Sequence, residues 1–159
     1  MQMVIPSKFI FRAGPSDDLP AAIAHQIGLM YDDIYVSLLS AVSLVNRGDP
    51  AAADFTAFTT DGTWKVDADA LDLSSIVPVS TIAALVRVTV ADGGVGNVFI
   101  LKKNGQTNDF NSLVIRTQVA DITNDGMGLV FVDANRKIAY WGTNVVFSSI
   151  SVIVCGWVV

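Results

Sequence analysis

Hydrophobic residues recur with the period of an α-helix in the first third of the chain. A start signal at Ser16-Asp17-Asp18 and a stop signal at residues 46–50, which contain Gly48 and Pro50, bound this region. Between them the apolar stripe is Ile23, Ile27, Met30, Ile34, Leu38, Ala41 or Val42, and Val45. The spacing of three and four residues predicts one helix. Its second half is apolar almost all round, so we expect it either to bundle subunits or to lie across the following domain.

From residue 51 the hydrophobic period changes to two, which is the period of a β-strand. Val86, Val88 and Val90, for example, alternate with Arg87 and Thr89, which predicts a strand with one buried and one exposed face. Strands are predicted over residues 83–91, 98–103, 113–119, 129–132, 137–141 and 145–159, and a hairpin is predicted around Asp61-Gly62 that pairs Phe55 with residues 63–66. Turn clusters rich in Asp, Asn and Gly separate these strands at residues 92–96, 104–105, 123–126 and 133–135. The sequence therefore predicts a mainly β fold: a jelly-roll-like antiparallel β-sandwich over residues 51–159, preceded by one N-terminal α-helix within an attachment or oligomerisation segment, residues 1–50.

The last predicted strand is apolar on both of its faces. Ile153 and Trp157 lie on one parity and Val152 and Val154 on the other, so this strand is expected to be central in its sheet or to contact another subunit. Together with the helix, this strand gives a predicted oligomer interface: Ile34, Leu38, Val42, Val45, Ile153, Trp157 and Val159.

Composition supports burial between subunits and narrows the partners. Hydrophobic residues make up 52% of the chain and charged residues 16%, which is more apolar side chain than a monomer of 159 residues usually hides. The net charge of −5 and the scattered cations argue against nucleic acid as a partner. The longest apolar runs are shorter than the roughly 20 residues that a membrane helix needs, so no membrane span is expected.

The residue types needed for most site chemistry are scarce. His25 and Cys155 are single and lie far apart in the sequence, so neither a catalytic triad nor a zinc site can be assembled from them. All 15 acidic residues are Asp, which is typical of turns and caps, and the strings around Asp67 and Asp121 are interpreted as turns in preference to calcium loops. We expect no catalytic residues, no metal, no cofactor and no enzymatic activity.

Three aromatic residues in the β region suggest an alternative. Trp64, Tyr140 and Trp141 are possible ligand-facing aromatics, because flat rings cover the apolar faces of sugars, although aromatic residues dispersed over strands more often belong to a core or an interface. The alternative function is therefore a carbohydrate- or receptor-binding β-sandwich module for host attachment, with a host surface glycan as partner.

Two sets of segments resemble proteins of bacteriophage particles. Residues 11–22 and 26–33 resemble a short N-terminal module of tailed-phage fibres and appendages. Residues 60–64, 71–78, 86–90, 101–105 and 154–157 resemble the C-terminal β-sandwich modules of phage virion proteins. The resemblance implies a homotrimer located in the virion, acting as a capsid decoration protein, head fibre or tail appendage. Its implied partners are copies of itself and the major capsid or other virion proteins, and it transfers no catalytic residues.

Overall fold

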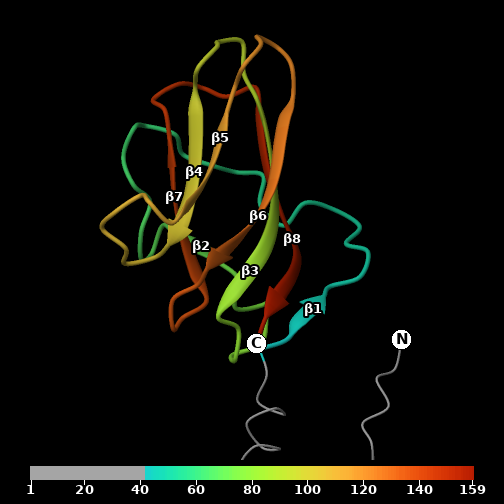
Figure 1. The fold of residues 1–159 in the computed structure, drawn as a ribbon. Coiled ribbons are helices and arrows are strands. Elements are labelled where there is room, and N and C mark those ends of the chain that lie inside the picture. The colour runs from blue at the N-terminus through green and yellow to red at the C-terminus, as the bar shows by residue number, and fades with distance from the viewer. Residues whose placement is uncertain (1–41) are drawn as a thin grey trace, which may run out of the picture. The chain divides into compact units, whose positions relative to one another are not determined.

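The computed structural model describes residues 42–159, which fold as a β-sandwich (Figure 1). The strands in this part of the chain are β1 (Leu44–Asn46), β2 (Leu71–Asp72), β3 (Ala83–Ala91), β4 (Val98–Lys103), β5 (Ser112–Arg116), β6 (Asn124–Phe131), β7 (Lys137–Gly142) and β8 (Ser149–Val158). Sheet A has the order β1-β8-β3-β6 and sheet B the order β2-β7-β4-β5, and every pairing is antiparallel. The predicted mainly β, antiparallel sandwich is confirmed.

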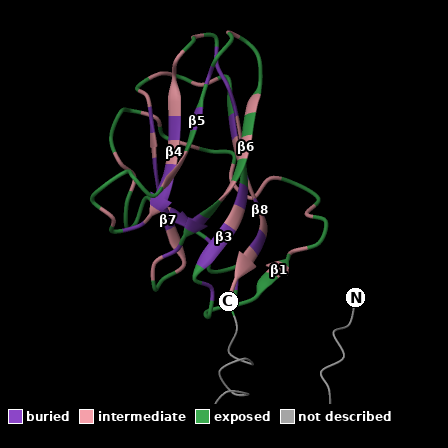
Figure 2. Cartoon of the chain, in the orientation of Figure 1, coloured by how far each residue is buried: buried purple, intermediate pink, exposed green. Residues whose placement is uncertain are grey.

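The core lies between the inner faces of the two sheets (Figure 2). In β3 the predicted alternation is confirmed, because Val86, Val88 and Val90 are fully buried while Arg87 is exposed. From sheet B, Phe99 and Tyr140 meet Phe58, whose ring centroid lies 5.1 Å from that of Phe99 and 5.2 Å from that of Tyr140 in edge-on geometry. Each such buried side chain contributes about 1.5–3 kcal/mol of transfer free energy, so this packing explains why the two sheets stay together.

The last strand is central, as its two apolar faces predicted. β8 lies between β1 and β3, and Val152 and Val154 fill the core. The register with β3 shifts between Leu85 and Val86, which leaves Cys155 as the extra residue of a β-bulge. Beyond the bulge, Trp157 pairs with Ala84 on one side and Val45 on the other, and it packs against the core.

The predicted N-terminal helix lies mostly outside the described residues, but its last residues do not belong to a helix. Residues 44–46 form β1 and pair with β8, so the segment around Val45 belongs to the sandwich. Gly48 does take a left-handed conformation, with φ 93°, but it follows a strand and not a helix. No helix between residues 42 and 159 is long and apolar enough to cross a membrane.

Two local predictions in the β region are wrong. The hairpin around Asp61-Gly62 does not form, because Phe55 bridges to Val152 of sheet A whereas Lys65 bridges to Tyr140 of sheet B. The segment around Asp61 therefore crosses from one sheet to the other. The turn expected at residues 123–126 is instead the beginning of β6, which pairs with β3 from Asn124 onward.

Candidate functional site

The outward side of sheet A carries hydrophobic residues across all four of its strands. Directly paired residues of antiparallel strands share a face, so the register defines rows that cross the sheet. The rows are Phe131, Ala83, Val158 and Leu44; then Leu129, Leu85 and Gly156; then Met127, Arg87 and Ile153. We call the larger apolar residues of these rows the apolar face: Leu44, Leu85, Met127, Leu129, Phe131, Ile153 and Val158.

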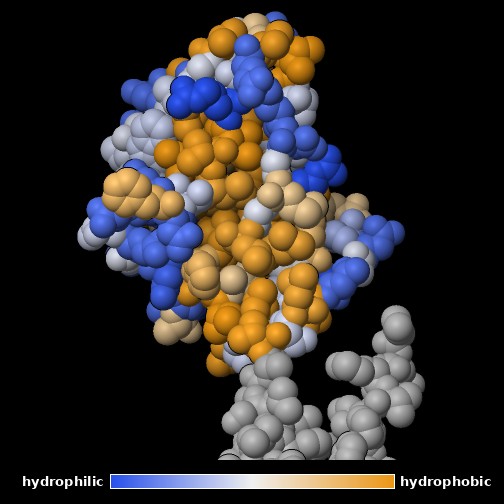
Figure 3. All heavy atoms as spheres, viewed as in Figure 1, coloured by the Kyte–Doolittle hydropathy of each residue, from blue (hydrophilic) through white to orange (hydrophobic). Residues whose placement is uncertain are grey.

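Much of the apolar face is in contact with solvent. Leu44 is 61% exposed, and the three consecutive outward residues of β6, Met127, Leu129 and Phe131, are 57%, 54% and 45% exposed. In Figure 3 hydrophobic side chains form a band that reaches the end of the sandwich at which β1, β3 and β8 meet in Figure 1. A contiguous patch of large exposed apolar residues is often a contact site.

A pair of opposite charges borders the apolar face. The Arg87 guanidinium on β3 donates to the Asp125 carboxylate on β6 at 2.5 Å, and both side chains are half exposed. Thr89 and Ser151 continue this polar border in the same row as Asp125. The four lysines within residues 42–159 all lie on sheet B strands or on the segment bridged to β7. The apolar face thus has a mixed-charge border without lysine.

The outward side of sheet B holds two of the predicted ligand-facing aromatics. Lys65 bridges to Tyr140, and this register places Trp64 beside Trp141 on the opposite side of the strand pair. The Lys102 ammonium lies 3.7 Å from the centroid of the Trp64 ring and donates to Asp109 Oδ1 at 2.8 Å. The Lys102 side chain is only 4% exposed, so the surrounding protein holds its ammonium in place. The attraction between this ammonium and the Trp64 ring then fixes the ring from beneath.

Tyr140, the third predicted aromatic, lies in the core. It packs against Phe58 and Phe99, and its hydroxyl accepts the backbone N–H of Thr59 at 3.3 Å. The structure therefore brings Trp64 and Trp141 together on the outside and places Tyr140 between the sheets.

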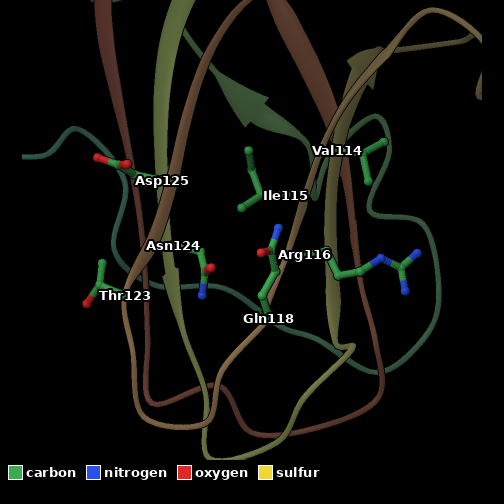
Figure 4. A pocket seen from close by; sticks show the side chains of 7 residues that line it. All are labelled: Val114, Ile115, Arg116, Gln118, Thr123, Asn124 and Asp125. Atoms are coloured by element: carbon green, nitrogen blue, oxygen red, sulfur yellow. The ribbon is translucent and has the colours of Figure 1, made fainter.

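A shallow polar groove of about 380 Å³ lies beside the ends of β5 and β6 (Figure 4). It is lined by Val114, Ile115, Arg116, Gln118, Thr123, Asn124 and Asp125. Several of these polar groups already have partners within the chain: Arg116 donates to the Gly96 carbonyl at 3.2 Å, and Asn124 donates to the Ile122 carbonyl at 2.9 Å. The groove therefore offers few groups that are not already engaged in holding loops.

Some residues of the predicted oligomer interface lie within residues 42–159, and the structure places them in two environments. Ile153 belongs to the apolar face, and Val42, next to β1, is 68% exposed. Val45 and Trp157 pair with each other, and Trp157 packs against the core; Val159 is half-buried at the chain end. Ile34 and Leu38 lie outside the described residues. Sequence reasoning missed Leu44, Met127, Leu129 and Phe131, although the alternation of large residues over 127–131 was a usable signal.

The aspartates of the described region act mainly within turns. Asp72 accepts the backbone N–H of Ser74 at 2.8 Å, and its hydrogen bonds to Ser74 lower its pKa. Asp61 binds both Thr63 and Lys65, and the hydrogen bond from Lys65 is the largest cause of its lowered pKa. Within residues 42–159, no three or more His, Cys, Asp or Glu side chains gather as metal ligands.

Comparison with known proteins assigns no family. No family model matches the chain, and no curated protein matches it. Among solved structures, the chain has a weak likeness to a carbohydrate-binding module from Cellvibrio mixtus lichenase 5A, determined in complex with cellotriose. The TM-score is 0.36 and the identity 12%, over 70% of this chain and 95% of the module.

Proposed function

We propose that this chain is a non-enzymatic structural subunit of a phage particle, a capsid decoration protein, head fibre or tail appendage, that works by binding copies of itself and other particle proteins. The observation that carries the proposal is the apolar face, where Leu44, Met127, Leu129 and Phe131 are each 45–61% exposed on one side of one sheet. Covering these side chains with protein releases water from apolar surface, so the face provides free energy for assembly.

The fold is compatible with this role. The orders β1-β8-β3-β6 and β2-β7-β4-β5 are those of an eight-stranded jelly roll, an architecture found in viral capsid proteins and in lectins. Because a fold does not by itself specify a function, the choice of a phage particle rests on the resemblance of residues 60–64, 71–78 and 154–157 to phage virion modules.

The distribution of charge gives the subunit an orientation. Sheet A presents the apolar face, while the described lysines lie with sheet B on the other side of the sandwich. A subunit that contacts its neighbours through sheet A therefore directs sheet B away from that contact, and the Lys65 and Lys102 side chains of that side are themselves only 14% and 4% exposed.

The test is to purify particles made with the wild-type chain, with Leu129→Asp or with Val114→Asp. Leu129 and Val114 are matched, because they are 54% and 48% exposed and lie on the edge strands of sheets A and B, respectively. We expect mass spectrometry to find the wild-type and Val114→Asp chains in particles, and electron cryomicroscopy to show the sandwich there. Leu129→Asp should be depleted about tenfold or more. Absence of the wild-type chain from particles would overturn the proposal.

A second candidate function, glycan binding, is favoured by one observation. Trp64 and Trp141 lie side by side on the outward side of sheet B, and the buried Lys102 ammonium holds the Trp64 ring. A ring fixed before binding loses little conformational entropy when a sugar stacks on it.

A glycan array followed by calorimetry on any bound sugar tests this candidate. Trp64→Ala and Trp141→Ala should each weaken binding about tenfold or more, whereas Phe110→Ala should not, because Phe110 is 98% exposed on the β4–β5 loop and serves as a control for general stickiness. Binding that is lost equally in all three variants, or no binding by the wild-type chain, would exclude the Trp64 and Trp141 surface as a glycan site.

A further inference from the structure

We infer that the apolar face of sheet A is a homotypic interface, at which two copies of this chain pack face to face about a two-fold axis, a pair in place of the homotrimer that the resemblance implies. The inference deepens the proposed function, since it names the partner and the surface for self-assembly. Its occupant is a second copy because the face is self-complementary in apolar character and in charge.

The apolar face has the size of an interface centre. The apolar face spans four strands about 4.8 Å apart and three rows about 7 Å apart along the strands. With the side chains that extend beyond the outer strands and rows, its area is on the order of 400 Å². A standard interface covers about 800 Å² per partner, with an apolar centre and a polar rim. Thr89, Ser151 and Asn46 border the apolar face and provide such a rim.

The charges at the border complement themselves. Arg87 Nη2 and Asp125 Oδ2 lie 2.5 Å apart on neighbouring strands, and each side chain is about half exposed. Consider a two-fold axis that lies in the plane of the interface and passes between the two residues. It places Arg87 of one copy opposite Asp125 of the other copy, and Asp125 opposite Arg87. The chain carries a net charge of −5, yet this face has a balanced pair, so the face suits its own copy better than it suits a strongly basic partner.

The edge strand of sheet A contributes side chains to the same face. β6 is an edge strand of eight residues, Asn124–Phe131, and it contains neither lysine nor proline. Edge strands that stay free are usually protected by such residues or by a bulge, and long apolar edges without them tend to be covered. Met127, Leu129 and Phe131 all project from this strand onto the apolar face, so a second copy that covers the face packs over the side chains of the edge strand, whereas the free backbone groups of β6 point along the plane of the sheet.

Sedimentation velocity on the full chain from about 1 to 100 μM tests the inference first. We expect wild-type and Val114→Asp chains to form dimers, and Leu129→Asp and Met127→Glu to weaken dimerisation about 100-fold, because each places an unpaired charge in the interface. Circular dichroism and thermal unfolding verify that the variants are folded. A monomeric wild-type chain at 100 μM, or a folded Leu129→Asp chain that associates as strongly as Val114→Asp, would overturn the inference.

Dimerisation and particle incorporation can fail separately. A dimer that depends on Leu129 but belongs to a protein absent from particles would leave this inference standing and remove the proposed function. If the chain belongs to particles but uses the apolar face only to contact other proteins, the proposed function would stand and this inference would fail.

A charge-reversal experiment separates contact between copies from the pair within one chain. Arg87→Asp gives a border with two carboxylates, and Asp125→Arg gives a border with two guanidinium groups. Each variant alone should dimerise more weakly than wild type, whereas an equimolar mixture should form mixed dimers with about tenfold preference, measured by native mass spectrometry. A mixture that shows only the statistical proportion of mixed dimers would contradict the two-fold arrangement.

Discussion

Gly126 of β6 lies so close to Ile115 of β5 that a β-carbon on the glycine would stand 2.5 Å from the Ile115 Cδ1 atom. The same relation recurs two residues later, where a β-carbon on Gly128 would stand 3.0 Å from Leu113 Cδ1. The two glycines thus leave room for the inward side chains of β5. The close approach of β5 to the inner face of β6 closes the sandwich along one side. The opposite face of β6 points outward.

Gly126→Ala should lower the free energy of unfolding by about 1–3 kcal/mol, because the new methyl group overpacks against Ile115. Urea titration followed by circular dichroism measures the change. Gly93→Ala is the control, since its β-carbon would meet nothing nearer than Asp121 Oδ1 at 3.6 Å. A Gly126→Ala cost equal to that of the control would contradict the close packing of β5 on β6.

Asn104 and Asp133 provide a pH-dependent link between two turns. The Asn104 amide donates to Asp133 Oδ2 at 2.9 Å and to Asp67 Oδ1 at 3.3 Å. Burial would raise the pKa of Asp133, but hydrogen bonds from Asn104 and from the backbone of Lys137 and Asn135 outweigh it and lower the pKa. Folding therefore favours the carboxylate, and its contribution to stability is present above the ordinary pKa of about 3.9 and is lost as pH falls through the lowered value.

Asp133→Asn should accordingly cost more stability at pH 6 than at pH 3. The measurement is urea unfolding of both proteins across this range, and the difference between them isolates Asp133 from the other aspartates that titrate. A difference that does not change with pH would show that Asp133 titrates alike in the folded and unfolded states.

The Lys102–Asp109 pair should respond unequally to removal of its two members. Lys102 is 4% exposed and Asp109 54%, so Asp109→Asn leaves a buried ammonium with a weaker partner, at a cost of about 1–2 kcal/mol. Lys102→Met removes the charge and keeps the packing beneath Trp64, and it should change stability by less than about 1 kcal/mol. Thermal unfolding measures the stability of both variants. A larger loss of stability in Lys102→Met than in Asp109→Asn would contradict this prediction.

Some features of the fold followed from the sequence because they depend on local alternation. Val86, Val88 and Val90 predicted the inner face of β3. The apolar residues on both faces of residues 145–159 predicted a strand that is central or contacts another subunit, and β8 is central. Asn124, Asp125 and Gly126 suggested a turn, since these residue types favour turns wherever no tertiary contact overrides them. Here the pairing of these residues with β3 overrides that preference, and the close approach of the Ile115 side chain favours glycine at position 126, which only the assembled sandwich reveals.

The candidate sites depended even more on contacts between distant residues. Nothing in the sequence near Trp64 indicated that Lys102 would lie beneath its ring, and Tyr140 looked as suitable for a ligand as Trp141 until the register placed it in the core. The apolar face arises in the same way, because it combines residues of β1, β3, β6 and β8 that are far apart in the chain.

Asp54 should prove more important for stability than its place outside the strands suggests. Its carboxylate accepts the backbone N–H of Val154 at 2.8 Å and the Arg47 guanidinium at 2.5 Å, and its side chain is 9% exposed. Asp54→Ala should cost about 2–3 kcal/mol, because it leaves a buried N–H without a partner, and Asp54→Asn should cost less. Equal stabilities of Asp54→Ala and wild type in urea titration would show that water replaces the carboxylate.

The oxidation rate of Met127 tests directly whether copies of this chain cover the apolar face. Its side chain is 57% exposed in the isolated sandwich and lies on the apolar face. Mass spectrometry after brief peroxide treatment should show Met127 oxidised at least about tenfold more slowly in wild type than in Leu129→Asp at 100 μM, with the difference vanishing on dilution below the dissociation constant. Equal rates at 100 μM would contradict the account.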